Sequence, residues 1–166
     1  MTKIRLAAPL QIDSLVDGEG LRIVIWCQGC DMNCKNCHNP ETHNLKGGKT
    51  YEIAEIIKKI SQLKNNYDGI TFSGGQPLLQ IEACLEIAKY CKSQNLNIWL
   101  YSGYTYEQII KDPKKKELLE EIDVLVDGRY IDELKDLTLP FRGSSNQRII
   151  DVQKSLQKGS IVLYLK

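Results

Sequence analysis

Strand-like and helix-like segments alternate along most of this 166-residue chain, and this alternation limits its possible folds more than any other feature. Runs typical of buried strands cover residues 21–27, 69–73, 97–101, 123–126 and 161–165. Helical spacing of apolar residues predicts a helix over 50–64 with Thr50 as its N-cap, another around 81–91, and helical segments interrupted near Pro113. Such alternation favours a mostly parallel sheet covered by helices.

The chain length sets the size of this α/β fold. A complete eight-fold β/α barrel takes about 250 residues, so the sequence predicts an incomplete (partial) β/α barrel formed by a single domain over 1–166. Ligands of such sheets collect at the carboxyl ends of the strands. A cysteine-rich loop, the pair Gly74-Gly75 and Asp127 each follow a predicted strand, so we expect them to meet at one edge.

Composition excludes several classes of function. The 22 Lys and Arg side chains nearly balance 21 Asp and Glu, and a net charge of +1 predicts neither nucleic-acid nor membrane binding. The longest apolar run is far shorter than the roughly 20 residues that span a bilayer, and no secretory signal is visible. We therefore expect a cytoplasmic protein whose six cysteines are reduced or bound to metal.

Three of these cysteines, Cys30, Cys34 and Cys37, have the spacing C-x3-C-x2-C. Three thiolates so close in sequence can hold three corners of a cubic iron–sulfur cluster and leave the fourth iron without a protein ligand. Clusters that only carry electrons usually have four cysteine ligands, whereas an open metal position admits substrate. The spacing thus indicates a cluster that binds a molecule and reacts with it.

Structural zinc is the alternative interpretation of this loop. Cys27 extends the pattern to C-x2-C-x3-C-x2-C, which supplies four possible ligands. Structural zinc sites usually separate their two C-x2-C pairs by about 15–20 residues, and Cys27 ends a predicted strand where its side chain can simply pack. Cys84 and Cys91 lie on the apolar face of a predicted helix, where free cysteine behaves as a small hydrophobic residue.

A glycine-rich turn, Ser73-Gly74-Gly75-Gln76-Pro77, follows one strand and precedes a helix. Glycine lets the backbone approach a ligand closely, but a Gly-Gly-x-Pro sequence alone is only a turn. Together with the cysteine triad, it resembles the radical S-adenosylmethionine (SAM) superfamily, whose usual motif is Gly-Gly-Glu-Pro. Gln76 departs from that motif but keeps a carbonyl acceptor for the SAM ammonium. Asn36 stands where many members carry an aromatic residue, a change that affects adenine packing.

More specifically, nearly the whole chain is similar to the activating proteins of anaerobic (class III) ribonucleotide reductases. The matching segments are Val16-Asp17-Gly18-Glu19-Gly20-Leu21-Arg22, Gln28-Gly29-Cys30, Leu100-Tyr101-Ser102-Gly103-Tyr104, Val124-Leu125-Val126-Asp127-Gly128-Arg129-Tyr130 and Arg142-Gly143-Ser144-Ser145-Asn146-Gln147. Several have simpler interpretations. Residues 17–20 suit a hairpin turn, and Ser144 and Asn146 suit either a partner contact or a local cap.

The resemblance implies a radical SAM fold and a set of ligands. Cys30, Cys34 and Cys37 would hold one [4Fe–4S] cluster per chain, whose open iron would chelate SAM. The remaining SAM-site residues would be Asn36, Cys37, His38, Gly74, Gly75, Gln76, Asp127 and Arg129, with Arg129 pairing with the SAM carboxylate and His38 packing or hydrogen-bonding within the cluster loop.

The implied activity is generation of a glycyl radical on anaerobic ribonucleoside-triphosphate reductase, with electrons from a donor such as flavodoxin or ferredoxin. An incomplete barrel suits a protein loop as substrate because it leaves one side open. Two alternatives stay open: another radical SAM enzyme, either the activator of pyruvate formate-lyase or 7-carboxy-7-deazaguanine synthase, and a non-catalytic iron–sulfur or zinc module.

Overall fold

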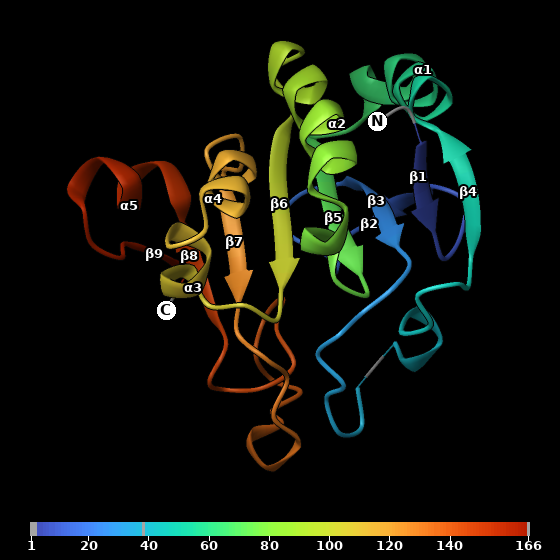
Figure 1. Cartoon of the computed structure of the whole chain (residues 1–166). Coiled ribbons are helices and arrows are strands. Elements are labelled where there is room, and N and C mark those ends of the chain that lie inside the picture. Colours follow the sequence, from blue (N-terminus) through green and yellow to red (C-terminus); the bar gives the residue numbers. More distant parts are fainter. Residues whose placement is uncertain (1–2, 38, 166) are drawn as a thin grey trace.

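A computed structural model describes residues 3–37 and 39–165 and shows one nine-stranded mixed sheet with helices (Figure 1). Its strands run in the order β4-β1-β3-β5-β6-β7-β8-β9, and β2 pairs with β3 beside this path. The strand bounds are β1 Lys3–Leu6, β2 Gln11–Ser14, β3 Arg22–Cys27, β4 Lys49–Glu52, β5 Gly69–Gly74, β6 Asn97–Ser102, β7 Val124–Asp127, β8 Arg148–Asp151 and β9 Leu163–Leu165.

The central strands β3, β5, β6 and β7 are parallel, and helices connect them in the β/α manner. The α-helices are α1 Ile53–Leu63, α2 Ile81–Ser93, α3 Tyr106–Ile110, α4 Pro113–Leu119 and α5 Val152–Lys158. Both flanks of this parallel centre are antiparallel: β1, β2 and β4 on one side, β8 and β9 on the other. The sheet does not close, which confirms the partial barrel with a mostly parallel centre.

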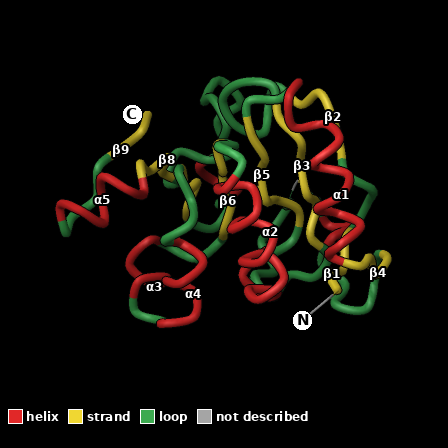
Figure 2. The backbone as a smooth tube through the Cα atoms, turned by 90° about the horizontal axis from the view of Figure 1, so that it is seen from above, coloured by secondary structure: helices red, strands yellow, loops and turns green. Residues whose placement is uncertain are grey.

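Alternating side chains of the central strands build two different faces, as expected for a sheet covered on one side by helices. Figure 2 shows α1, α2 and the α3–α4 pair gathered along one side of the curved sheet. The main core lies there, with Ile25 of β3, Phe72 of β5 and Leu100 of β6 fully buried. On the opposite face a smaller cluster surrounds Trp99, which is buried with Val126.

Arg22 occupies this second face as an almost completely buried cation. Its guanidinium donates to the Thr71 hydroxyl at 2.8 Å and to the backbone carbonyls of Glu19, Ile70 and Asn97, and it lies 5.6 Å from the Trp99 ring centre. Burial lowers the pKa of Arg22 to about 10. A side chain added at Gly18 would meet both Arg22 and Trp99 at 2.9 Å, so the glycine-rich connection between β2 and β3 is a hairpin that also packs over this face.

The predicted helix N-cap at Thr50 is wrong. Thr50 lies inside β4, where it pairs with Arg5 of β1, and α1 begins three residues later with Glu52 at its N-cap position. The helical periodicity holds over residues 53–63, which form α1. Residues 49–52 form a strand because they pair with β1 at the start of the chain. Over residues 3–37 and 39–165, no helix is both long and apolar enough to cross a membrane.

Candidate active site

A cavity of about 560 Å³ opens where the central parallel strands end. Its walls include Trp26 at the end of β3, Gly74 at the end of β5, Ser102 at the end of β6 and Gly128 just after β7. The cysteine loop and the 128–147 segment lie together beyond these strand ends (Figure 1). The predicted convergence of loops at one sheet edge is therefore present.

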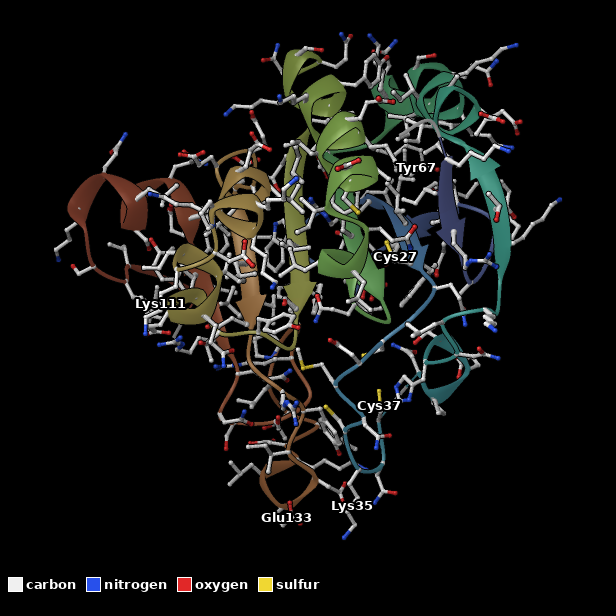
Figure 3. The ribbon with its side chains drawn as sticks, viewed as in Figure 1. Cys27, Lys35, Cys37, Tyr67, Lys111 and Glu133 are labelled. Carbon is white, nitrogen blue, oxygen red and sulfur yellow. The ribbon has the colours of Figure 1, made fainter. Side chains whose placement is uncertain are left out.

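All three cysteines of the triad line this cavity and are half-buried. Burial is the main cause that raises the pKa of Cys30 and of Cys34, and the neighbouring thiol adds to it in each case. With a raised pKa, such a thiol stays protonated near neutral pH when no metal is bound. A positive metal centre favours the thiolate, so metal binding would release the proton. Figure 3 shows Cys37 in the loop beyond the strand ends, whereas Cys27 lies higher, within the sheet.

The cysteine loop is held by backbone hydrogen bonds to two other segments. The Gly29 N–H donates to the Thr42 carbonyl at 2.6 Å, and the Cys30 N–H donates to the His43 carbonyl at 3.2 Å. From the glycine turn, the Gln76 N–H donates to the Gly29 carbonyl at 2.7 Å. These bonds fix the first cysteine relative to the end of β5.

Side chains attach the rest of the loop to the opposite wall. Asp31 accepts a hydrogen bond from the Tyr104 hydroxyl at 3.1 Å, and Met32 packs so closely on Gly103 that a side chain there would come within 2.8 Å of it. The Asn36 side-chain amide donates to the Asp132 carboxylate at 2.9 Å. The loop is thus tied to the segments that follow β6 and β7.

The glycine turn needs both of its glycines. Gly74 has φ of +104°, and a side chain there would meet the Cys27 carbonyl oxygen at 2.5 Å. At Gly75 an added side chain would lie 2.3 Å from the Gly29 carbonyl oxygen. The Gly75 N–H already donates to the Cys27 carbonyl at 2.9 Å. The turn therefore serves first to seat the cysteine loop against β5, a role that the motif alone does not indicate.

Gln76 lies in the cavity wall and is fully buried. Its carbonyl oxygen accepts from the Leu78 N–H at 3.1 Å and from the Ser102 hydroxyl at 3.2 Å. Its side-chain nitrogen has no hydrogen-bond partner among the described residues. A buried donor without a partner costs free energy, which the two bonds to the amide oxygen offset in part.

Asp127 lies at the expected edge of the sheet. Its carboxylate binds Arg148 and the Tyr106 N–H, whereas the resemblance implies a place in the SAM site. Its carboxylate is 1% exposed and accepts from the Arg148 Nε at 3.0 Å, from its Nη2 at 2.6 Å and from the Tyr106 N–H at 2.7 Å. It does not line the cavity, whereas Gly128 and Tyr130 do. Arg148 lies on β8, a strand that the sequence pattern does not predict.

The resemblance also places Arg129, Asn36 and His38 in the SAM site, and the structure describes the first two of them. Arg129 is exposed near Cys34, where its charge opposes the rise in the thiol pKa. Asn36, at φ of +54°, directs its amide to Asp132 and is absent from the cavity wall. Tyr130, by contrast, is an aromatic residue in that wall, which its place in a motif segment could have indicated. His38 lies outside the described residues.

The positions of the cysteines bear on the choice between a cluster and structural zinc. Within the described parts of the chain, no three Cys, His, Asp or Glu side chains converge as ligands of one metal ion. Cys27 is fully buried, and its sulfur lies 4.0 Å from that of Cys84 in the core between sheet and helices. With Cys27 in the core, three thiols remain at the cavity, the number that the C-x3-C-x2-C pattern offers to a cluster.

An apolar rim surrounds the mouth of the cavity. We use this name for Leu15, Val16 and Leu137, which line the cavity and are 66%, 74% and 77% exposed. Leu15 and Val16 precede β3, whereas Leu137 belongs to the long segment before β8. Large exposed apolar side chains gathered at one opening are typical of a protein-interaction site.

Comparison with known proteins places this chain in a family. The model of the family described as "4Fe-4S single cluster domain" matches residues 16–150. The anaerobic ribonucleoside-triphosphate reductase-activating proteins of Vibrio cholerae and Haemophilus influenzae are 37% and 32% identical over 142 residues, which are 81% of this chain and 90% of each relative.

Two further similarities cover less of the matched proteins. The pyruvate formate-lyase-activating enzyme of Clostridium pasteurianum is 40% identical over 125 residues, 72% of this chain, but the chain spans only 50% of that enzyme's length. The crystal structure of QueE from Escherichia coli superposes with a TM-score of 0.51 at 14% identity, over 62% of this chain and 53% of QueE. The latter similarity shows the fold alone.

Proposed function

Since the chain belongs to the 4Fe-4S single cluster domain family and is homologous to anaerobic ribonucleoside-triphosphate reductase-activating proteins, we propose that it activates such a reductase by forming a glycyl radical on it. We further propose that residues 1–166 act as one radical SAM domain. The observation that carries this proposal is the cavity itself: three cysteine thiols share it with a glycine turn and an unpartnered buried donor.

In this proposal Cys30, Cys34 and Cys37 would hold one [4Fe–4S] cluster, and the glycine turn at Gly74 and Gly75 would contribute to the SAM site. When bound, these groups supply one-electron cleavage of SAM and, from it, the radical that abstracts hydrogen from glycine. The chain's own contribution is placement. The backbone bonds of Gly29 and Cys30 fix the cysteine loop, while Trp26 and Tyr101 form part of the cavity wall.

The cavity and its rim favour a macromolecular substrate. A volume of about 560 Å³ lies within the range of a site for one small-molecule ligand, roughly 300–1,000 Å³. Cluster and SAM would occupy it, so the glycine must arrive from outside. We propose that the apolar rim receives the glycine-bearing loop of the reductase, because the rim is continuous with the cavity that holds the reactive groups.

Several finer points belong to the same proposal. The electron comes from a reducing protein such as flavodoxin or ferredoxin, in a cytoplasm that keeps the thiols reduced. Arg129, exposed beside Cys34, is available for a SAM or partner carboxylate. Asp127 supports the site indirectly, because Arg148 and the Tyr106 N–H hold its carboxylate. The near-zero net charge supports a protein substrate over a nucleic acid.

Activation of pyruvate formate-lyase is the second candidate, favoured by the 40% identity to an enzyme of that name. The two candidates differ in the acceptor protein. The test combines the anaerobically reconstituted, reduced protein and SAM with either acceptor and records the glycyl radical by electron paramagnetic resonance. We expect the signal on the reductase and none on the lyase. A signal on the lyase alone selects the second candidate. A signal on neither, with intact cluster and SAM cleavage, rejects both.

A further inference from the structure

The long connection between β7 and β8, residues 128–147, passes along the cavity, and we call it the strap. Tyr130, Leu137 and Gln147 of the strap belong to the cavity wall. Figure 1 shows the strap reaching beyond the ends of the central strands, next to the cysteine loop. A connection longer than roughly 12–15 residues in a compact domain is usually either functional or disordered. The contacts that hold the strap therefore decide which of the two it is.

Gln147 closes the base of the strap with a single side chain. Its Oε1 accepts from the Gly143 N–H at 2.9 Å and from the Ser144 N–H at 3.2 Å. Its Nε2 donates to the Gly128 carbonyl at 3.0 Å. The amide thus joins the first residue of the strap to its last turn. All three partners are backbone groups, so Gln147 fixes the course of the main chain at both ends of the strap.

Phe141 anchors the strap at a second point. Its φ of +60° is a left-handed conformation that is rare for a bulky residue. The Phe141 carbonyl accepts from the Tyr101 hydroxyl at 2.8 Å, and its ring meets the edge of Trp99 with 5.3 Å between ring centres. A strained backbone of this kind persists only where the surrounding contacts enforce it. The strap is therefore held against β6 as well as against the end of β7.

Other side chains near Gln147 also bind backbone groups of the strap. The Asn146 side-chain amide donates to the Arg129 carbonyl at 2.8 Å, and the Ser144 hydroxyl accepts from the Ile131 N–H at 3.2 Å. The sequence left open whether Ser144 and Asn146 contact a partner or cap local backbone, and these bonds are local. The segment 142–147 is therefore the part of the strap that holds its two halves together.

The held strap carries exposed apolar side chains. Leu134 and Leu137 are 42% and 77% exposed. Beside them, the Asp132 carboxylate accepts from the Asn36 amide of the cysteine loop at 2.9 Å. Exposed apolar residues beside a reactive site suit the binding of another protein. A strap that is already ordered loses little further conformational freedom when that protein binds, which favours affinity.

We propose that Gln147 is a positioning residue for the reductase: by closing the base of the strap, it holds Leu134 and Leu137 where the reductase docks. The inference rests on the proposed function, because it takes the reductase as the partner. It deepens that function by giving the segment 142–147 a task, which is to shape the surface that receives the partner. Gln147 acts through the strap and does not contact the reacting atoms.

A contact with SAM is the competing role, because Gln147 lines the cavity. Its amide oxygen already accepts two hydrogen bonds, which use both lone pairs, and its nitrogen already donates to Gly128. Positioning of the backbone therefore accounts for most of the hydrogen-bonding capacity of this amide. The two roles differ in what a substitution changes: binding of the reductase, or binding and cleavage of SAM.

The first experiment tests the strap itself. Gln147→Met keeps the length of the side chain and removes all three bonds. Lys135 is exposed and pairs with Ser144 across the strap, so trypsin cleavage after Lys135 reports on its closure. In apo protein, we expect cleavage there to become faster by roughly tenfold or more, because hydrogen bonds that favour the closed form are lost. Gln153→Met is the matched control, since Gln153 also binds two backbone carbonyls but lies on α5.

The second experiment measures glycyl-radical formation at increasing concentrations of the reductase, with reduced, reconstituted protein and SAM. The KM for the reductase should rise by roughly tenfold in Gln147→Met, with the maximal rate within about twofold of the parent. SAM cleavage without the reductase should stay near the parent rate. Leu134→Asp leaves the Gln147 bonds in place, so it should raise the same KM and keep the parent's rate of cleavage at Lys135. Gln153→Met should match the parent in both experiments.

The outcomes separate this inference from the proposed function. An unchanged KM in Gln147→Met overturns the inference, and so does a loss of SAM cleavage with an unchanged KM, which would place Gln147 in the SAM site. If Gln147→Met does not fold, Leu134→Asp decides, and an unchanged KM in that variant overturns the docking role. A parent protein that cleaves SAM but forms no radical on the reductase instead refutes the proposed function itself.

Discussion

Arg148 on β8 donates two hydrogen bonds, at 3.0 Å and 2.6 Å, to the buried carboxylate of Asp127 on the neighbouring strand β7. The same guanidinium also reaches Glu107 at the start of α3, at 2.7 Å. One side chain therefore joins the last parallel strand, the first antiparallel strand beyond it and a helix. The Asp127 carboxylate also accepts from the Tyr106 N–H, which positions that helix over the strand end.

Removing this cation should destabilise the fold. Arg148→Met leaves Asp127 buried at 1% exposure without its counter-charge, and loss of one partner of a buried pair typically costs 3–5 kcal/mol. Arg148 is itself 32% exposed, so we expect about 3 kcal/mol, the low end of that range. Urea unfolding of apo protein measures it. Lys3→Met removes an exposed ion pair to Glu52 and should change stability by less than about 0.5 kcal/mol. Equal losses in both variants would contradict a special role of Arg148.

The Arg148–Glu107 contact predicts a dependence of stability on acid pH. The hydrogen bond from Arg148 lowers the pKa of Glu107 below its ordinary value. A group with a depressed folded-state pKa stabilises the fold above its unfolded pKa, about 4.3 for Glu, and this contribution disappears as pH falls through the folded pKa. Urea midpoints between pH 6 and pH 3 should therefore fall less steeply in Glu107→Gln than in the parent. Parallel pH profiles would show that Glu107 contributes nothing.

The triad predicts which cysteines hold the cluster. Alanine at Cys30, Cys34 or Cys37 should abolish the absorption spectrum of the anaerobically reconstituted protein, because each removes one of three iron ligands. Cys27→Ala should leave the spectrum largely intact, since the Cys27 sulfur lies in the core against Cys84. Cys91→Ala, in α2, is a second control. If Cys27→Ala removes the cluster as completely as Cys34→Ala does, the three-ligand model is wrong.

Gly75 offers a test of how the glycine turn and the cysteine loop depend on each other. From the sequence alone, valine at this position would weaken SAM binding while the cluster persists. Because an added side chain would lie 2.3 Å from the Gly29 carbonyl, we now expect Gly75→Val to impair cluster assembly as well. Iron content and absorption after reconstitution measure this. Gly159→Asn, at a helix end with open space around it, should keep the cluster. A Gly75→Val protein with full iron content would show that the two segments move independently.

The apolar rim predicts a separation of SAM chemistry from partner activation. Leu137→Asp and Val16→Asp place charges at the cavity mouth without touching the cysteine loop. We expect glycyl-radical formation on the reductase to fall by roughly tenfold or more, the effect of losing one substantial interface contact. SAM cleavage without the partner should stay near the parent rate. Leu163→Asp, on the edge strand β9, is the control. A loss of uncoupled SAM cleavage in the rim variants would contradict the docking role.

The sequence predicts those features of the fold that depend on residues close together in the chain, and misses those that depend on pairing between distant segments. The parallel strands, the helices between them and the cysteine loop follow from patterns within a few residues, and family membership inferred from the motifs is confirmed by the comparisons. The strand at Thr50 was missed because its partner, β1, lies over 40 residues away and overrides a helical pattern. The contact of Arg148 was also missed because its partner, Asp127, lies on another strand. A four-residue antiparallel strand carries too little pattern to place it beside Asp127.

The chemistry of Gln76 shows a further limit. Its residue type says that it can donate and accept, but only its surroundings decide which atom remains available. Leu78 is two residues away and could have suggested a capping bond, whereas Ser102 comes from another strand end. Motif comparison treats glutamine as a weaker glutamate. The hydrogen bonds around it commit its oxygen to Leu78 and Ser102.

The cysteine loop is suspended from carbonyls of Thr42 and His43 and pinned by the Gln76 N–H, all of which are protein contacts. Each of these contacts joins backbone to backbone, so no side chain is needed to make them. Substitutions at Thr42 and His43, and any non-proline substitution at Gln76, should therefore leave the attachments of the first cysteine in place. The loop can thus tolerate sequence change at the very positions that hold it.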